Sequence, residues 1–116
     1  MKDFKRMKRK KEEAMIHVIA TIELAPGKRE AFLKRVHALV PQVRAEAGCL
    51  EYGPAIDLPT GFKAQIPVRN NVVTFVEKWT DLKALEAHLG APHMKEYRED
   101  VKDMVLSTQL QVLQPA

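Results

Sequence analysis

Alternating apolar and polar positions predict the strands of this chain. In residues 16–24 the apolar side chains occupy every second position, a pattern typical of a strand with one buried face. Residues 71–79 are apolar on both faces for most of their length, and residues 107–114 predict a last strand. In residues 49–58, Pro54 cannot donate to a neighbouring strand, so this segment is expected to lie at a sheet edge or to bulge there. Its expected apolar face consists of Leu50, Tyr52, Ile56 and Leu58.

Apolar residues at helical spacing follow the first strand. Proline is favoured in the first turn of a helix, so Pro26 is expected to begin one that runs to about Ala47, with Gly48 as its stop. Pro41 lies inside this segment and is expected to kink or break the helix, because its ring removes a donor and crowds the preceding turn. The expected buried stripe consists of Phe32, Val36, Leu39, Val40, Val43 and Ala47.

An interrupted helical region precedes the last strand. Thr80 or Asp81 is expected to cap a short helix. Gly90 and Pro92 then break the chain, and a further helical piece is expected over residues 93–105. The apolar stripe of the short helix is expected to be Leu82, Leu85 and Leu89.

The resulting order, β-α-β-β-α-β, is that of the ferredoxin-like α+β fold. Its helices cover one face of an antiparallel sheet, so the other face must be polar or covered by something else. Because the first and third strands carry apolar residues on both faces, a second copy of the chain is the simplest cover. The sequence therefore predicts a homodimer packed sheet to sheet.

The excess positive charge is confined to one end of the chain. Residues 1–13 hold seven Lys or Arg against three Asp or Glu, whereas the rest of the 116 residues hold twelve of each. We therefore divide the chain into a basic N-terminal extension, residues 1–14, and one domain, residues 15–116. A domain without net charge has no overall electrostatic attraction for nucleic acid, so no nucleic-acid partner is expected.

Three sequence features favour the cytoplasm. No apolar run approaches the roughly 20 residues that span a bilayer, so no membrane insertion is expected. The N-terminus lacks the apolar core of a secretory signal. The single cysteine, Cys49, cannot form an internal disulfide and fits a reducing compartment.

The candidate catalytic and binding residues lie near the only tryptophan of the sequence. Trp79 ends the third strand on the same face as Glu77, and His88 and His93 follow on the next helical pieces. A zinc-binding helix places two histidines four residues apart, whereas these are five apart with a glycine and a proline between them, so no metal site is expected. The chain contains no GxGxxG turn, P-loop or nucleophile elbow.

What remains is an aromatic-lined pocket with an acid–base group. His88 borders the apolar stripe of its helix, and an imidazole can exchange a proton near neutral pH. Structural roles fit as well: core packing for Trp79, a helix hydrogen bond for His88 and a cap for His93. Glu77 could equally be a paired structural carboxylate. The residues alone thus support a small dimeric α+β domain with a candidate proton-transfer pocket.

Three segments resemble the antibiotic biosynthesis monooxygenase (ABM) domain family. They are EKWTDLKALEAHLGAPHMKEY at residues 77–97, ALVPQVRAEAGCLEYGP at residues 38–54, and the ending LQVLQPA. Among the members of this family, the chain most resembles the bacterial menadiol-oxidising quinol monooxygenases. The resemblance runs from about Met15 to the C-terminus.

This resemblance implies a dimeric α+β barrel that oxidises a small aromatic substrate, a hydroquinone or phenol, with O2 and without flavin, haem or metal. Because a phenolate reduces O2 more readily than a phenol, the protein must mainly supply a base and a dry cavity. His88 is the expected base. The expected substrate contacts are Trp79 and Tyr52 as cavity walls, with His93, Glu77, Tyr97 and Arg98 as hydrogen-bonding or anion-stabilising residues.

The chain departs from the pattern of some family members, and two alternative functions stay open. Polyketide-oxidising relatives carry an asparagine four residues before the tryptophan, where this chain has Phe75. A related isomerase of a small phosphorylated dione shares the two-histidine pattern, but its anionic substrate needs a cluster of cations, of which the sequence locates only Arg98. A non-catalytic small-molecule-binding dimer is the other alternative.

Overall fold

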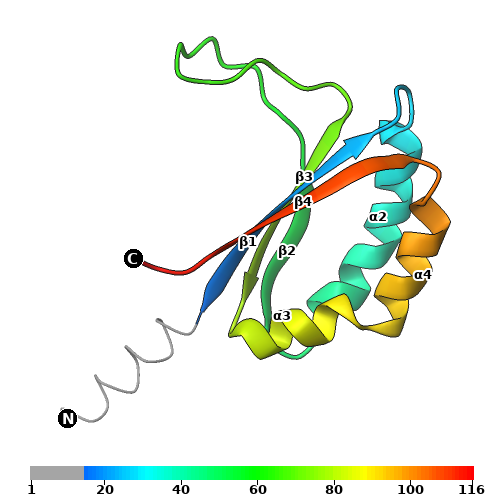
Figure 1. Cartoon of the computed structure of the whole chain (residues 1–116), viewed down its shortest axis with the longest axis vertical. Helices are drawn as coiled ribbons and strands as arrows, with labels where there is room; N and C mark the ends of the chain where they lie inside the picture. The colour runs from blue at the N-terminus through cyan, green and yellow to red at the C-terminus, as the bar shows by residue number, and fades with distance from the viewer. Residues whose placement is uncertain (1–14) are drawn as a thin grey trace.

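A computed structural model describes residues 15–116, and the predicted basic extension at residues 1–14 lies outside the described residues. Within the described part, four strands and three helices follow one another along the chain (Figure 1). In chain order they are β1 (Ile16–Leu24), α2 (Arg29–Arg44), β2 (Cys49–Ala55), β3 (Val72–Trp79), α3 (Leu82–Leu89), α4 (Pro92–Val101) and β4 (Val105–Leu113). This order confirms the predicted α+β pattern, with its second helix divided into α3 and α4.

The four strands form one antiparallel sheet in the order β2-β3-β1-β4. All three helices lie on the same side of this sheet (Figure 1), which confirms the ferredoxin-like arrangement. β2 is an edge strand, as Pro54 predicted, but its irregularity falls between Cys49 and Glu51 instead of at the proline. An edge strand has one side without a neighbour, so Pro54 can stay in the regular part of β2.

The core lies between the sheet and the helices. Every second residue of β1, from Ile16 to Leu24, is buried, as the alternation predicts. From β3 the buried set includes Val73, Phe75 and Trp79. The helices contribute Phe32, Val36, Leu39, Val40 and Val43 from α2, Leu85 from α3, and Met94, Tyr97 and Val101 from α4.

Helix α2 differs from the prediction at both ends and in its interior. It begins at Arg29, because Pro26 and Gly27 form a turn in which the Lys28 N–H donates to the Ala25 carbonyl. The helix continues through Pro41, whose carbonyl still accepts from the Ala45 N–H at 3.2 Å. Pro41 and His37, the residue whose carbonyl the proline cannot bind, are both exposed to solvent. The predicted last residue, Ala47, is exposed and lies beyond the helix.

Helix α3 buries a narrower face than predicted. Asp81 caps it by accepting a hydrogen bond from the Ala84 N–H at 2.9 Å. Leu85 and His88 are its buried residues, whereas the predicted stripe members Leu82 and Leu89 are exposed. Residues three apart lie on the same face of a helix, so Leu85 and His88 point inward together. The buried face of α3 therefore contains a histidine that was predicted only to border it.

A long loop, residues 56–71, joins β2 to β3 and extends away from the body (Figure 1). Ile56 and Leu58 were predicted to continue the buried face of the strand, but they lie exposed in this loop. Near its base, Arg69 binds Asp57 through Nε at 2.8 Å and Nη2 at 2.9 Å. These hydrogen bonds lower the pKa of Asp57 to about 2. The loop is thus tied at its base while its apolar side chains face solvent.

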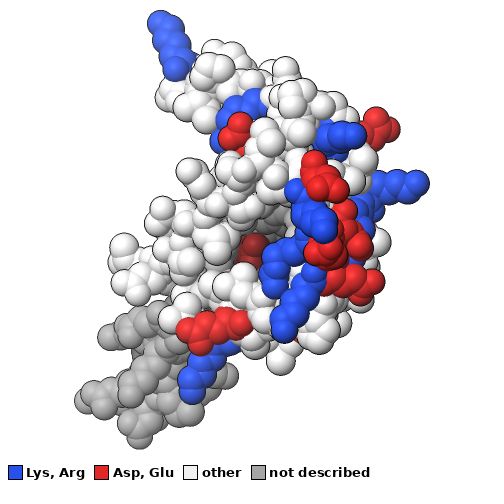
Figure 2. All heavy atoms as spheres, turned by 45° about the vertical axis from the view of Figure 1, so that its right-hand side comes forward, with Lys and Arg blue, Asp and Glu red and all other residues white. Residues whose placement is uncertain are grey.

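Charged side chains of both signs are mixed over one part of the surface, beside a hollow in which acidic atoms are visible at depth (Figure 2). No helix within residues 15–116 is long and apolar enough to cross a membrane.

Candidate active site

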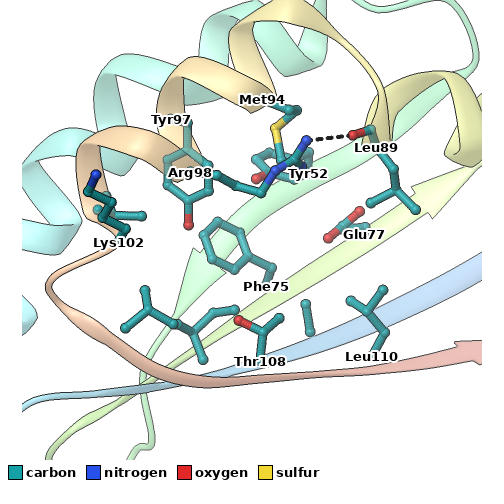
Figure 3. A pocket seen from close by; sticks show the side chains of 14 residues that line it. Tyr52, Phe75, Glu77, Leu89, Met94, Tyr97, Arg98, Lys102, Thr108 and Leu110 are labelled. Carbon is teal, nitrogen blue, oxygen red and sulfur yellow. Dashed lines mark hydrogen bonds between the residues drawn. The ribbon is translucent and has the colours of Figure 1, made fainter.

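A cavity of about 420 Å³ lies between the sheet and helix α4. Its floor comes from β1, β3 and β4, and its roof comes mainly from α4 (Figure 3). Most of the lining is apolar, and the polar groups that reach it are few. A predominantly apolar cavity of this size with a few placed polar groups is the usual form of a small-molecule site.

Glu77 supplies the cavity with a buried carboxylate. The alternation of β3 points Glu77 inward with Phe75 and Trp79, and only 6% of the residue is exposed. The indole Nε1–H of Trp79 donates to Oε1 of Glu77 at 2.9 Å. Burial raises the pKa of Glu77, while the Trp79 hydrogen bond and the nearby His88 ring partly oppose this shift. Glu77 can therefore exchange a proton closer to neutral pH than an exposed glutamate.

Two tyrosines bring phenol groups to the same cavity. Tyr52 comes from β2 and Tyr97 from α4, and both are buried. Burial raises the pKa of each phenol, so both stay protonated at neutral pH and can donate a hydrogen bond. The ring centroid of Phe75, which also lines the cavity, is 5.4 Å from that of Tyr52. Figure 3 shows Phe75 and Glu77 facing Tyr97 and Arg98 across the cavity.

Two cationic side chains of α4 and the turn after it border the cavity. Arg98 lines the cavity and donates from Nη2 to the Leu89 carbonyl at 2.9 Å. Lys102 also lines it and binds Oε1 of Glu99 at 2.6 Å. Both residues are exposed to solvent, so they belong to the rim of the cavity. The sequence located only Arg98, and the structure adds Lys102 as a second cation.

His88 lies behind the cavity wall. Its side chain is 2% exposed, and its ring centroid is 4.6 Å from that of Trp79 and 5.6 Å from that of Tyr52. Nδ1 of His88 is 2.8 Å from Oε2 of Glu46. The same oxygen is 2.8 Å from Nε2 of His93. One carboxylate oxygen thus joins both histidines of the sequence pattern.

The structure separates the predicted site residues into two groups. Tyr52, Glu77, Tyr97 and Arg98 line the cavity, whereas Trp79, His88 and His93 do not. Trp79 and His88 contact the lining from behind, through Glu77 and Tyr52. The role of His88 as a base stays a prediction.

Sequence reasoning missed Glu46. It lies 42 residues from His88, just before the Gly48 turn, and no local pattern links the two. The turn itself is held against α3, because the Thr80 N–H donates to the Gly48 carbonyl at 2.9 Å. Gly48 has φ +83°, and a Cβ there would lie 2.6 Å from the Ala84 Cβ. This close approach brings Glu46 beside the two histidines.

Two imidazoles and a carboxylate are also a ligand set for metals. Within residues 15–116, however, no group of three or more His, Cys, Asp or Glu residues has an arrangement that could hold a metal ion. The observed contacts are hydrogen bonds among the three side chains.

Sequence comparisons show which proteins this chain is similar to. The family described as "Antibiotic biosynthesis monooxygenase" matches residues 15–100. The Escherichia coli K12 protein named "Probable quinol monooxygenase YgiN" is 41% identical over 103 residues, which cover 87% of this chain and 98% of that protein.

Solved structures are similar over most of the chain. PA3566 from Pseudomonas aeruginosa has a TM-score of 0.74 at 28% identity, covering 90% of this chain and 97% of its own. SO0527 from Shewanella oneidensis has a TM-score of 0.73 at 26% identity, covering 89% of this chain and 92% of its own. The fold and these comparisons define an α+β domain of the monooxygenase type. The chain belongs to the antibiotic biosynthesis monooxygenase family.

Proposed function

We propose that this protein is a cofactor-independent monooxygenase that oxidises a hydroquinone or another phenolic aromatic with O2. The observation that carries the proposal is the buried carboxylate of Glu77 in an otherwise mainly apolar cavity flanked by two phenols. Such a cavity can take up a flat aromatic ring and hold its hydroxyl groups without admitting bulk water. The name of the Escherichia coli relative supports a quinol as the substrate class.

Glu77 and His88 form the proposed acid–base pair. Glu77 is the member that lines the cavity, and the His88 ring is near enough to influence the pKa of the Glu77 carboxyl. Within residues 15–116 no hydrogen bond to Nε2 of His88 is observed, which leaves this nitrogen able to accept a proton. The pair removes the proton of the substrate hydroxyl and so leaves an electron-rich phenolate.

The remaining steps balance without a further reductant. The phenolate supplies electrons to O2, and one oxygen atom bonds to a ring carbon. The O–O bond then breaks, and the second oxygen leaves as water with two protons. One hydroquinone and one O2 thus give one hydroxyquinone and one water. Tyr52 and Tyr97 can donate hydrogen bonds to the oxygens that carry negative charge during these steps.

The proposed assembly is a homodimer in which the sheet face opposite the helices is covered. Val76 on β3 points to that face and is 45% exposed, and its partner in register on β1 is Ile19. Phe62 in the 56–71 loop is 73% exposed and adds apolar surface. Apolar surface of this kind marks contact sites more often than free surface. The cytoplasmic location and the lack of a nucleic-acid partner stay predictions.

The direct test mixes the purified protein with menadiol under air and follows quinone formation. We expect the wild-type protein to accelerate the reaction over buffer. A His88→Ala variant should lose roughly 10²–10⁴-fold in rate, the usual contribution of a general base. Equal rates for the two proteins would remove His88 from the pair, and no acceleration over buffer would remove the activity.

A second candidate is an isomerase of a small phosphorylated dione. The presence of both Arg98 and Lys102 at the cavity favours it, because a phosphate needs cationic partners. Isomerisation consumes no O2, so an oxygen electrode separates it from the monooxygenase. A non-catalytic small-molecule-binding dimer would bind an aromatic ring without converting it in either assay.

A further inference from the structure

Glu46 contacts both His88 and His93, and the proposed reaction gives it no role. Its side chain is 13% exposed, and Oε2 accepts from one nitrogen of each histidine at 2.8 Å. An ionised carboxylate can only accept hydrogen bonds, so each imidazole must present an N–H to this oxygen. The contact therefore places a proton on Nδ1 of His88 and on Nε2 of His93.

The proton on Nδ1 determines whether Nε2 of His88 can accept a proton. In a neutral imidazole one ring nitrogen donates and the other accepts, and the hydrogen bond of one determines the state of the other. The two ring nitrogens point in diverging directions, so the bond to Glu46 turns Nε2 away from that carboxylate. The Trp79 ring at 4.6 Å and the Tyr52 ring at 5.6 Å then keep the imidazole plane in place.

The position of Glu46 is itself fixed by the fold. The Cys49 N–H donates to the Glu46 carbonyl at 3.2 Å, and the Glu46 N–H donates to the Val43 carbonyl at 2.9 Å. His88 belongs to α3 and His93 to α4, so one carboxylate ties the α2–β2 turn to both helices. His93 is 20% exposed on its side chain, which gives the network a more solvent-accessible end than the buried His88.

We propose that Glu46 is a positioning residue that holds His88 in its Nδ1–H form, so that Nε2 is the nitrogen that accepts the proton that Glu77, which lines the cavity, takes from the substrate. This proposal rests on the function proposed above. His93 supports it by donating to the same oxygen, which keeps the carboxylate oriented toward His88. Neither Glu46 nor His93 lines the cavity, so both act through His88.

The first test is nitrogen-15 NMR of the imidazole rings in the wild-type protein, with His88 assigned by its loss in His88→Ala. We expect neutral His88 to carry its proton on Nδ1 and a bare nitrogen at Nε2. A proton on Nε2 of neutral His88 would overturn the proposal. This measurement needs no active enzyme and no variant at Glu46.

The second test compares the kinetics of Glu46→Gln with the wild type in menadiol oxidation. The amide can donate to Nδ1 as well as accept from it, so the preference for the Nδ1–H form should weaken. We expect kcat to fall roughly 10²-fold with little change in KM, because the substrate does not touch Glu46. Glu46→Asp keeps the carboxylate and should recover part of kcat and of the Nδ1–H signal.

Glu86→Gln is the matched control, since it removes an exposed carboxylate from α3. Unchanged kcat in Glu46→Gln would contradict the positioning role. An inactive wild-type protein with His88 in the Nδ1–H form would remove the proposed oxidation but keep the role of Glu46. Thermal unfolding of each variant shows whether a loss of rate reflects a loss of fold.

Discussion

The indole N–H of Trp79 and the carboxylate of Glu77 are joined by a 2.9 Å hydrogen bond within the core. This bond occupies one carboxylate oxygen, and Glu77 still lines the cavity. An indole is a donor only, so it favours the ionised form of its partner, whereas burial opposes that form. The balance raises the pKa of Glu77 and makes this residue the titratable centre of the cavity.

The first prediction concerns the stability of Glu77→Gln as a function of pH. Because the pKa of Glu77 is raised in the folded protein, the native state binds more protons than the unfolded state above the ordinary value of 4.5. The free energy of unfolding of the wild type should therefore fall as pH rises from 4.5 through the folded pKa. Glutamine lacks this titration but can still accept from Trp79, so the variant should show a flatter curve.

Urea unfolding of both proteins between pH 4 and pH 8 measures this difference. Parallel curves would show that Glu77 does not titrate with a raised pKa. In the menadiol assay, Glu77→Gln should also lose about 10²-fold in kcat, the lower end of the usual contribution of a general acid–base group. The control is Glu51→Gln, which changes an exposed carboxylate of β2.

The second prediction concerns Gly48→Ala. Gly48 has φ +83°, and its added Cβ would meet the Ala84 Cβ and the Thr80 Oγ1, each at 2.6 Å. A left-handed residue with a Cβ and an overpacked contact should together cost roughly 2–4 kcal/mol of unfolding free energy. Gly27→Ala is the control, because Gly27 has a similar φ of +79° but open space around it.

Chemical denaturation of the two glycine variants separates strain from crowding. We expect Gly48→Ala to lose clearly more stability than Gly27→Ala, and to lose activity because the Glu46 turn moves away from α3. Equal losses in the two variants would mean that the close approach at Gly48 contributes nothing.

The third prediction concerns the 56–71 loop. Asp57→Asn removes the ion pair with Arg69, and it leaves a single side-chain oxygen in place of the two that accept from the guanidinium and the backbone amide of Arg69. Hydrogen exchange of this amide should become faster, while β1 and β3 keep their protection. Since the pKa of Asp57 is lowered to about 2, its stabilising effect is present above 3.8 and is lost as pH falls through about 2. Slow exchange of the Arg69 amide in Asp57→Asn would show that the ion pair does not hold the loop.

The fourth prediction concerns the proposed dimer. Val76→Lys places a charge on the sheet face opposite the helices, where a second copy is expected to pack. Analytical ultracentrifugation should show a dimer for the wild type and a shift toward monomer for this variant. Leu82→Lys, at an exposed site on α3, should leave the dimer intact. A monomeric wild type, or an unaffected Val76→Lys dimer, would contradict the proposed interface.

Periodicity predicted the strands and the order of elements, because alternation and helical spacing report directly on which side chains are buried. It could not predict that α2 runs through Pro41, since the exposure of that proline depends on tertiary packing. Nor could it predict that His88 is buried beside Leu85 on α3, where the leucines were the local signal.

Part of the site was also predictable, because alternation reports which strand residues point inward. Tyr52 and Glu77 lie on strand faces that the alternation points inward, and they line the cavity, whereas Tyr97 was expected there only from the family resemblance. Glu46 and Lys102 could not be linked to them, because their contacts depend on how a turn and a helix end approach distant elements. Contacts between residues so far apart in the chain produce no recognisable spacing pattern in the sequence.

The most direct test of the central claim uses ¹⁸O2 with menadiol and the dialysed wild-type protein. A monooxygenase acting through the Glu77 cavity should place one labelled oxygen atom in a hydroxyquinone and the other in water. Glu77→Gln should form this product much more slowly at the same protein concentration. Unlabelled quinone accompanied by hydrogen peroxide, or labelled product formed equally fast by Glu77→Gln, would contradict the account.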